Sequence, residues 1–260
     1  VLVYLVFATH VLLDSFTVYG TQIFWPLVTT PMTWSSIFII DPLYTVPLLI
    51  GVIAALIAAR DRRWGHTANS VGIVISSAYL VWTLAAKQHV EQVASNALQQ
   101  QNLDHVRLLT TPAPFNTLLW RVLAVDDRHY YEGYYSVFDD DHNIRFERYP
   151  RGLDLIEPIA ESWPVQRLRW FSKEFFAAGL VGNDIIVTDL RMGAEPEYIF
   201  RFRVGRLSNP HAQPTPVVQL PGIRNFERLH WIWARIWDQQ AREHGKKATV
   251  SIPATVIRQQ

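Results

Sequence analysis

Apolar residues crowd the first 86 positions of this 260-residue chain, and charged residues crowd the remainder. Two apolar segments, 37–59 and 68–86, are each long enough to cross a hydrocarbon layer of roughly 30 Å as a helix. The second segment contains small residues that favour close helix–helix contact, namely Gly72, Ser76, Ser77 and Ala78. The alternative is a pair of buried helices in a soluble protein. We expect two membrane spans, because runs this long contain so few charges.

A short basic loop between the two segments sets their expected orientation. Residues 60–66 carry three arginines, and basic loops of membrane proteins face the cytoplasm. The opposite ends of both segments would then lie at the outer face. We therefore predict a multi-pass inner-membrane protein with an extracytoplasmic C-terminal domain. This orientation places the following polar residues toward one side of the bilayer: His10, Asp14, Asp41, Lys87 and His89.

His10 and Asp14 lie four residues apart in an otherwise apolar stretch. On an α-helix these positions share a face, so the imidazole and the carboxylate would point the same way. An apolar environment disfavours both groups unless something pairs with them. A metal ion, a bound substrate or a polar partner would do so. The competing interpretation is a hydrogen bond between helices, made by the pair or with a neighbour.

After residue 102 the pattern becomes that of a soluble α+β domain. Strand-like runs alternate bulky and polar residues, which is typical of an antiparallel sheet with one solvated face. The expected strands are Trp120–Val125, Tyr130–Phe138, Ile144–Tyr149, Ile185–Leu190 and Tyr198–Val204. The prolines in 110–120 indicate a linker. Segments 165–176 and 225–240 are expected to form amphipathic helices.

The second of these helices places four large residues on roughly one stripe, which we assign to the core or to an interface: Phe226, Leu229, Trp233 and Trp237. The predicted fold is thus an α-helical membrane part at 1–102, followed by an α+β soluble domain with an antiparallel sheet at 103–240. The last residues, 241–260, are expected to form a flexible tail.

A long motif around the His/Asp pair resembles a known family. The string T-H-x-L-L-D-x-x-T-x-Y-G-T-Q, followed by W-P and then by I-F-I-I-D-P-L-Y-T, is similar to the inner-membrane-associated metal-dependent hydrolases, also labelled LexA-binding. The matching residues are Thr9, His10, Leu12, Leu13, Asp14, Thr17, Tyr19, Gly20, Thr21, Gln22, Trp25, Pro26, Ile37 to Asp41 and Pro42 to Thr45. Family members carry further acidic and histidine motifs upstream. Because the chain starts after those motifs, we expect it to be an N-terminally truncated piece of a longer protein.

The resemblance implies metal-assisted hydrolysis. His10 would bind a divalent metal ion such as zinc, and Asp14 would either bind it or orient the histidine. Asp41 would act as a further ligand or as the general base; its alternative role is to cap a helix at Asp-Pro. Catalytic zinc ordinarily has three protein ligands, so the missing segment would supply the rest.

Three more residues are candidates for substrate binding. Thr17 is one of them, although it would equally end its helix by bonding the backbone. Lys87 and His89 are the others; their alternatives are a snorkelling anchor and a surface histidine. A site at membrane depth favours a lipid or another amphiphilic ester or phosphoester.

The composition limits the remaining function classes. The chain has no cysteine, so any metal must be held by histidine, carboxylate, carbonyl or water. A formal net charge of +1 and the lack of a helix-turn-helix signature predict no nucleic-acid partner. The expected partners are the lipid bilayer and an amphiphilic substrate. The rival to a hydrolase is a non-enzymatic membrane protein whose β-rich domain binds a partner and whose His/Asp pair is structural.

Overall fold

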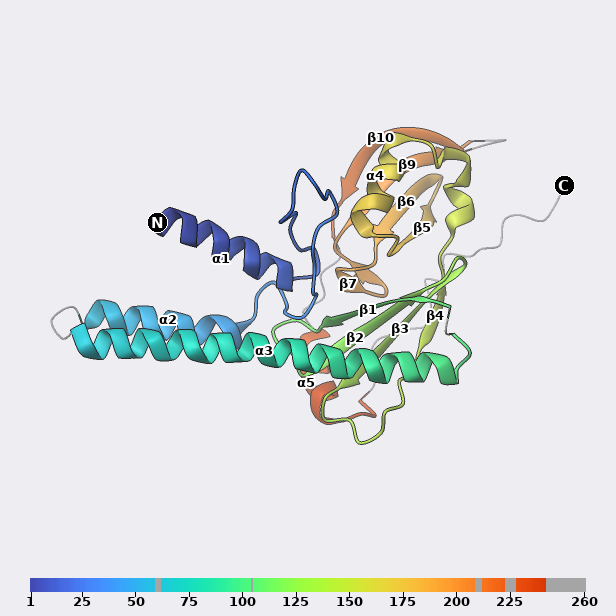
Figure 1. Ribbon diagram of the computed structural model, residues 1–260. Coiled ribbons are helices and arrows are strands. Elements are labelled where there is room, and N and C mark those ends of the chain that lie inside the picture. Colours follow the sequence, from blue (N-terminus) through green and yellow to red (C-terminus); the bar gives the residue numbers. More distant parts are fainter. Residues whose placement is uncertain (59–61, 104, 209–211, 223–227, 242–260) are drawn as a thin grey trace.

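A single long helix, α3 (Arg62–Gln100), connects the two parts of the molecule (Figure 1). The computed structural model describes residues 1–58, 62–103, 105–208, 212–222 and 228–241. The first half of α3 projects from the rest of the chain, whereas its second half lies against a β-sheet. A helical part followed by an α+β domain with antiparallel strands confirms the predicted fold class.

The projecting half of α3 forms a hairpin with α2 (Pro42–Ile57). A side chain at Gly72 would meet the carbonyl oxygen of Pro47 at 2.5 Å, so a bare backbone is needed at this crossing. Ser76 donates a hydrogen bond of 2.7 Å from its hydroxyl to the carbonyl of Tyr44. The predicted use of small residues in this contact is confirmed at Gly72 and Ser76, whereas Ser77 and Ala78 are exposed.

The first predicted span is shorter than expected. Asp41 accepts a hydrogen bond of 2.9 Å from the backbone N–H of Leu43, so α2 begins only at Pro42. Its 16 residues measure about 24 Å, less than the roughly 30 Å of a bilayer core. Within the described ranges, α3 is the one helix long and apolar enough to cross a membrane by length and composition. A second crossing therefore stays a prediction.

The N-terminal helix, α1 (Leu2–Phe16), projects to the same side as the hairpin (Figure 1). It buries only Ser15 and Phe16 among its own residues. The loop that follows is tied to the α+β domain: the ring of Tyr19 stacks on Phe171, and the guanidinium of Arg191 lies 4.6 Å from the Tyr19 ring centre. This contact holds the end of α1 against the α+β domain.

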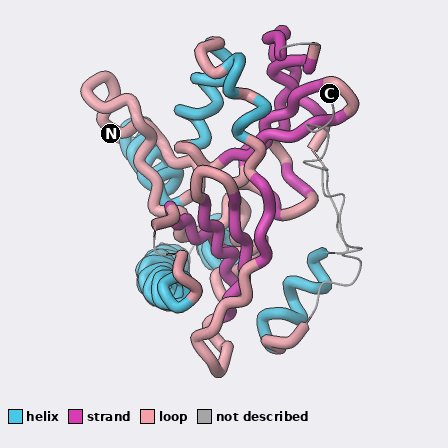
Figure 2. Tube along the Cα trace, turned by 90° about the vertical axis from the view of Figure 1, so that its right-hand side faces the viewer, coloured by secondary structure: helices cyan, strands magenta, loops and turns pink. Residues whose placement is uncertain are grey.

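The α+β domain contains two four-stranded antiparallel sheets rather than the single sheet predicted (Figure 2). The first sheet runs in chain order through β1 (Arg107–Pro112), β2 (Leu119–Val125), β3 (His129–Ser136) and β4 (Glu147–Pro150). The second has the order β10-β9-β6-β5, with β5 (Phe176–Val181), β6 (Asp184–Asp189), β9 (Arg201–Leu207) and β10 (Ala212–Leu220). The remaining elements are η1 (Leu153–Leu155), η2 (Glu157–Ile159), α4 (Trp163–Ser172), the β7 (Gly193–Ala194) and β8 (Glu197–Tyr198) hairpin, and α5 (Arg228–Trp237).

The second half of α3 forms one core with the first sheet. Val90, Ala94 and Ala97 are fully or almost fully buried there, and they pack with Trp120 and Tyr135. The polar composition of residues 87–102 predicts instead that the apolar span continues here as a surface helix. It is buried on one face because its small and β-branched residues recur at helical spacing and meet the inward side chains of the sheet.

Two assignments made from the sequence differ from the structure. One concerns a proline-containing segment, and the other concerns residues with a left-handed backbone conformation. The segment 110–120 is not a linker, since β1 runs to Pro112 and β2 begins at Leu119. The helix predicted at 165–176 ends at Ser172, because Lys173 and Glu174 have positive φ angles of 52° and 68°. Left-handed residues stop a helix, and β5 starts immediately afterwards.

The stripe predicted for the last helix, assigned to the core or to an interface, does not enter the core at its two tryptophans. Its buried face holds Ile232 and Ile236, whereas Trp233 and Trp237 are 64% and 59% exposed. Phe226 and most of the predicted tail, 242–260, lie outside the described residues. The sequence pattern fails here because α5 has two apolar faces, and helical spacing alone does not show which face meets the sheet.

Candidate functional site

His10 and Asp14 face each other on α1, as predicted. The Nε2 of His10 lies 3.5 Å from Oδ2 of Asp14, and the two side chains are 70% and 44% exposed. A separation of 3.5 Å is longer than a normal hydrogen bond. An ion pair this exposed adds little to stability. The pair is therefore available for a ligand rather than engaged in holding the fold.

The separation of the two donor atoms suits a shared metal ion. Two ligands of one tetrahedral zinc, each about 2.0–2.1 Å from the metal, lie about 3.3–3.4 Å apart. The observed 3.5 Å is close to this value. However, the part of the chain that the structure describes contains no group of three or more His, Cys, Asp or Glu side chains able to hold a metal. The pair thus fits two ligands of an incomplete set.

Thr17 lies one turn beyond Asp14 and ends the helix. Its hydroxyl donates a 2.7 Å hydrogen bond to the carbonyl of Asp14, and Thr17 is the C-terminal cap residue of α1. This is the backbone role that the sequence left open. Its assignment to substrate binding stays a prediction.

Asp41 is almost completely buried and has two clear structural partners. One carboxylate oxygen caps α2, and the other accepts a 2.8 Å hydrogen bond from the hydroxyl of Tyr79 on α3. The Tyr79 hydroxyl is in turn 2.9 Å from the hydroxyl of Thr117. These contacts match the capping alternative, and they join the base of the hairpin to the α+β domain. The catalytic role of Asp41 stays a prediction.

Lys87 and His89 lie further along α3, where the helix meets the first sheet. The ammonium of Lys87 is 2.8 Å from the carboxylate of Glu91 and donates to the hydroxyl and the carbonyl of Thr110 at 2.8 and 3.1 Å. An ammonium has three donors, so these contacts already account for all of them. Lys87 therefore fastens β1 to α3, and binding a substrate would cost one of these bonds.

His89 and a second histidine are exposed side chains that both contact the buried Tyr135. Its Nε2 is 3.2 Å from the hydroxyl of Tyr135, which is 3.0 Å from Nδ1 of His142. The two imidazole rings are 5.8 Å apart. His89 is thus engaged with the first sheet, and the predicted cluster with His10 and Asp14 is not assembled among the described residues.

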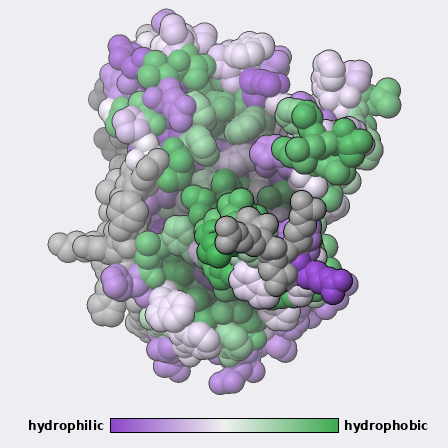
Figure 3. Space-filling view, turned by 90° about the vertical axis from the view of Figure 1, so that its left-hand side faces the viewer, coloured by the Kyte–Doolittle hydropathy of each residue, from purple (hydrophilic) through white to green (hydrophobic). Residues whose placement is uncertain are grey.

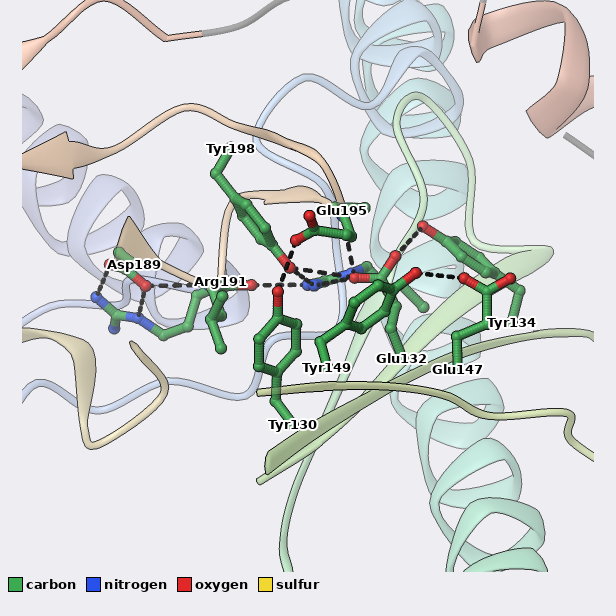
Figure 4. Close-up of polar contacts among 12 residues, drawn as sticks. Tyr130, Glu132, Tyr134, Glu147, Tyr149, Asp189, Arg191, Glu195 and Tyr198 are labelled. Atoms are coloured by element: carbon green, nitrogen blue, oxygen red, sulfur yellow. Dashed lines mark hydrogen bonds and ion pairs between the residues drawn. The ribbon is translucent and has the colours of Figure 1, made fainter. Parts of the chain in front are cut away.

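Sequence reasoning missed a buried charged network around Glu132 in β3 (Figure 4). One Glu132 oxygen lies 2.7 Å from Nη2 of Arg121 and 3.3 Å from the hydroxyl of Tyr198; the other accepts a 3.1 Å bond from Tyr134. Arg228 of α5 approaches the same carboxylate at 3.8 Å. The network therefore joins β2, β3, the β7–β8 hairpin and α5.

The tyrosines of this network act as hydrogen-bond donors. Burial, and then the charge of Glu132, hold the pKa of Tyr198 well above its usual value. Burial and the nearby carboxylate of Glu195 raise the pKa of Tyr130 in the same way, and its hydroxyl donates to Glu195 at 2.6 Å. Both phenols stay protonated at physiological pH. Because every strong acceptor meets a donor, the network is a structural junction. Strand alternation would only have indicated that Glu132 shares a face with Tyr130 and Tyr134.

The N-terminal part of the chain is similar to a known protein family. Residues 1–90 match the model of a family described as YdjM inner membrane protein. This stretch includes α1, α2 and most of α3, so the part that carries His10 and Asp14 is similar to inner membrane proteins. No curated protein and no solved structure matches the chain.

Replacing Glu132 with alanine should strongly destabilise the α+β domain. The change leaves the buried Arg121 without its carboxylate, and breaking a buried pair in this way costs about 3–5 kcal/mol of the free energy of unfolding. Thermal melting of the detergent-solubilised protein measures the effect. The matched control is Glu157→Ala at an exposed carboxylate. Equal melting temperatures for the two variants would contradict the structural role of the network.

Substitutions at Asp41 test its role as a helix cap. Asp41→Ala should lower stability by about 1 kcal/mol, the usual cost of losing a helix cap. Asp41→Asn should retain most of that stability, because an amide oxygen also caps a helix. Melting temperatures in detergent give the comparison. If alanine were as stable as asparagine here, capping would not be the role of this side chain.

Proposed function

We propose that this protein is a membrane-bound metal-dependent hydrolase and that His10 and Asp14 form part of its metal site. The observation that carries the proposal is their geometry: the two donor atoms are spaced as ligands of one ion and face outward from α1. The similarity of residues 1–90 to inner membrane proteins supports a membrane setting. In such a setting, polar pairs on apolar helices are functional more often than structural.

The roles of the residues follow from their donor atoms. Nε2 of His10 and Oδ2 of Asp14 would hold the ion, and at least one more ligand would come from outside the described residues. The metal, when bound, supplies an activated water at neutral pH. In the alternative arrangement, Asp14 would orient the imidazole of His10 instead of binding the ion.

The surroundings of the pair favour an amphiphilic substrate. The neighbours on α1 are large and apolar, including Val6, Phe7 and Leu12, which are all more than half exposed. A substrate with an ester or phosphoester group next to an acyl chain would place its polar part at the pair and its apolar part along the helix.

The rival is that the pair only holds helices together. Among the described residues α1 buries only its last two, so a partner helix for the pair would, like a third metal ligand, come from outside them. The rival and the hydrolase differ in what removal of the pair would do: loss of stability for the first, and loss of bound metal for the second.

His10→Ala and Asp14→Ala should each remove bound metal without weakening the fold. The expected change in the free energy of unfolding is small, because α1 buries only Ser15 and Phe16 and the pair packs against no described element. Metal content of the purified, full-length protein is measured by elemental analysis, together with its melting temperature. His66→Ala is the control, an exposed histidine on α3. A wild-type protein without stoichiometric metal, or variants that keep it, would overturn the proposal.

We further propose that the α+β domain is extracytoplasmic. Arg63 lies in the first turn of α3, at the end of the α2–α3 hairpin remote from the sheets (Figure 1), and the basic segment 60–66 is adjacent to it in the sequence. The preference of basic loops for the cytoplasm then puts the sheets on the other side.

The absence of cysteine makes this orientation directly testable. A single cysteine at exposed Val181 of β5 should react with a membrane-impermeant maleimide in intact cells with a permeabilised outer envelope. A cysteine at exposed Thr67, near the hairpin tip, should react only after the inner membrane is lysed. The reverse pattern of labelling would place the domain in the cytoplasm.

A further inference from the structure

α5 presents a second apolar face on the outside of the α+β domain. Trp233 and Trp237 are 64% and 59% exposed, and their rings are 5.9 Å apart. Phe138, in the loop after β3, is 52% exposed and stacks on Trp237 at 5.0 Å. We call these three residues the aromatic patch. They form one continuous surface, and contiguous exposed apolar patches often mark interaction sites, whereas a single exposed apolar residue is normal.

The aromatic patch is held firmly from beneath. Arg235 makes two hydrogen bonds of 2.7 Å to the carboxylate of Asp139, and both side chains are buried. The hydroxyl of Ser136 donates at 2.7 Å to the carbonyl of Ile236. Because Asp139 directly follows Phe138, the ion pair fixes both components of the patch relative to each other. The patch is therefore preorganised rather than a loosely attached end of the chain.

The aromatic patch lies level with the point along α3 where the apolar section of this helix ends. α5 packs on Leu119 at the start of β2. Two residues earlier, the hydroxyl of Thr117 contacts both Tyr79 and the indole N–H of Trp82 on α3. Buried contacts with the α+β domain begin on α3 shortly after this level, from Ala86 onward. Figure 1 accordingly shows α5 at the end of the first sheet nearest the hairpin.

The direction of α5 suits a helix that lies on a membrane surface. In Figure 2, α3 is seen end-on, whereas α5, flanked by grey segments, is seen from the side. The axis of α5 thus runs across the direction in which α3 projects. Figure 3 views the molecule from the hairpin end, where apolar residues gather on α1 and around the hairpin and continue onto the neighbouring surface of the domain.

From this placement we propose that the aromatic patch docks into the interfacial region of the bilayer that α3 enters. Tryptophan is enriched at this level of membranes because its ring is apolar and its N–H can meet headgroups and water. Arg228 and Arg235 of α5 are engaged with Glu132 and Asp139 inside the domain. Attachment therefore depends on apolar burial rather than on anionic lipid, and it does not depend on the hydrolase proposal.

The test uses the full chain in phosphatidylcholine nanodiscs. Ala234 is exposed between the two tryptophans, so Ala234→Cys carries a unique spin label and leaves the patch intact. Its collision rates with oxygen and with a water-soluble nickel chelate report depth, expected to be about 5–10 Å below the headgroup boundary. The control is Trp163→Cys, a similarly exposed tryptophan of α4 in the second half of the domain, whose label should meet the nickel chelate freely.

Adding Trp233→Ser and Trp237→Ser to the Ala234→Cys chain should return the label to water, with an unchanged melting temperature. Equal nickel accessibility at positions 234 and 163 would overturn the proposal. Two other occupants would also overturn it. Dipolar broadening between labels would reveal a second copy on the patch, and loss of protection on truncation after residue 241 would reveal that the following residues cover it.

Discussion

The packing of α3 on the first sheet is the contact on which the rest of the structure depends. One face of the helix, at Val90, Ala94 and Ala97, is buried in one cluster with Trp120 and Tyr135. Four to five turns earlier, the same helix approaches α2 closely through small residues such as Gly72 and Ser76. A continuous helix thus changes from contacts typical of lipid-embedded helices, through small residues, to contacts typical of a water-soluble core. Every other element is positioned relative to this axis.

Polar groups near that transition fall into two kinds. Asp41 and Lys87 are buried and have their hydrogen-bonding capacity used by the protein itself, so they hold the hairpin, α3 and β1 together. His10 and Asp14 are exposed and meet each other at a distance too long for a good hydrogen bond. Removing a buried group of the first kind lowers the stability of the fold. Removing an exposed group of the second kind changes the stability little, and for that reason these groups are the better candidates for binding a ligand.

The sequence predicted those features of the fold that depend on long-range composition and on local residue spacing. The switch from apolar helices to strands, the shared face of His10 and Asp14, and the small residues of the hairpin are all read from periodicity. It did not predict features set by tertiary contacts. Two sheets look like one when strands are counted locally, and a helix with two apolar faces, such as α5, does not reveal which one is buried. The network around Glu132 was missed because its members come from β2, β3, the β7–β8 hairpin and α5, far apart in the chain.

The unbroken course of α3 has a mechanical consequence. Between Arg62 and Gln100 the helix contains no proline, so it bends little, and its far half is locked into the first sheet. Helices in a bilayer adjust to its thickness by tilting. In a thinner membrane the hairpin would tilt, and the two sheets would rotate with it. No flexible joint in α3 separates them. With α3 in the bilayer as proposed, membrane thickness would in this way also set the orientation of the α+β domain.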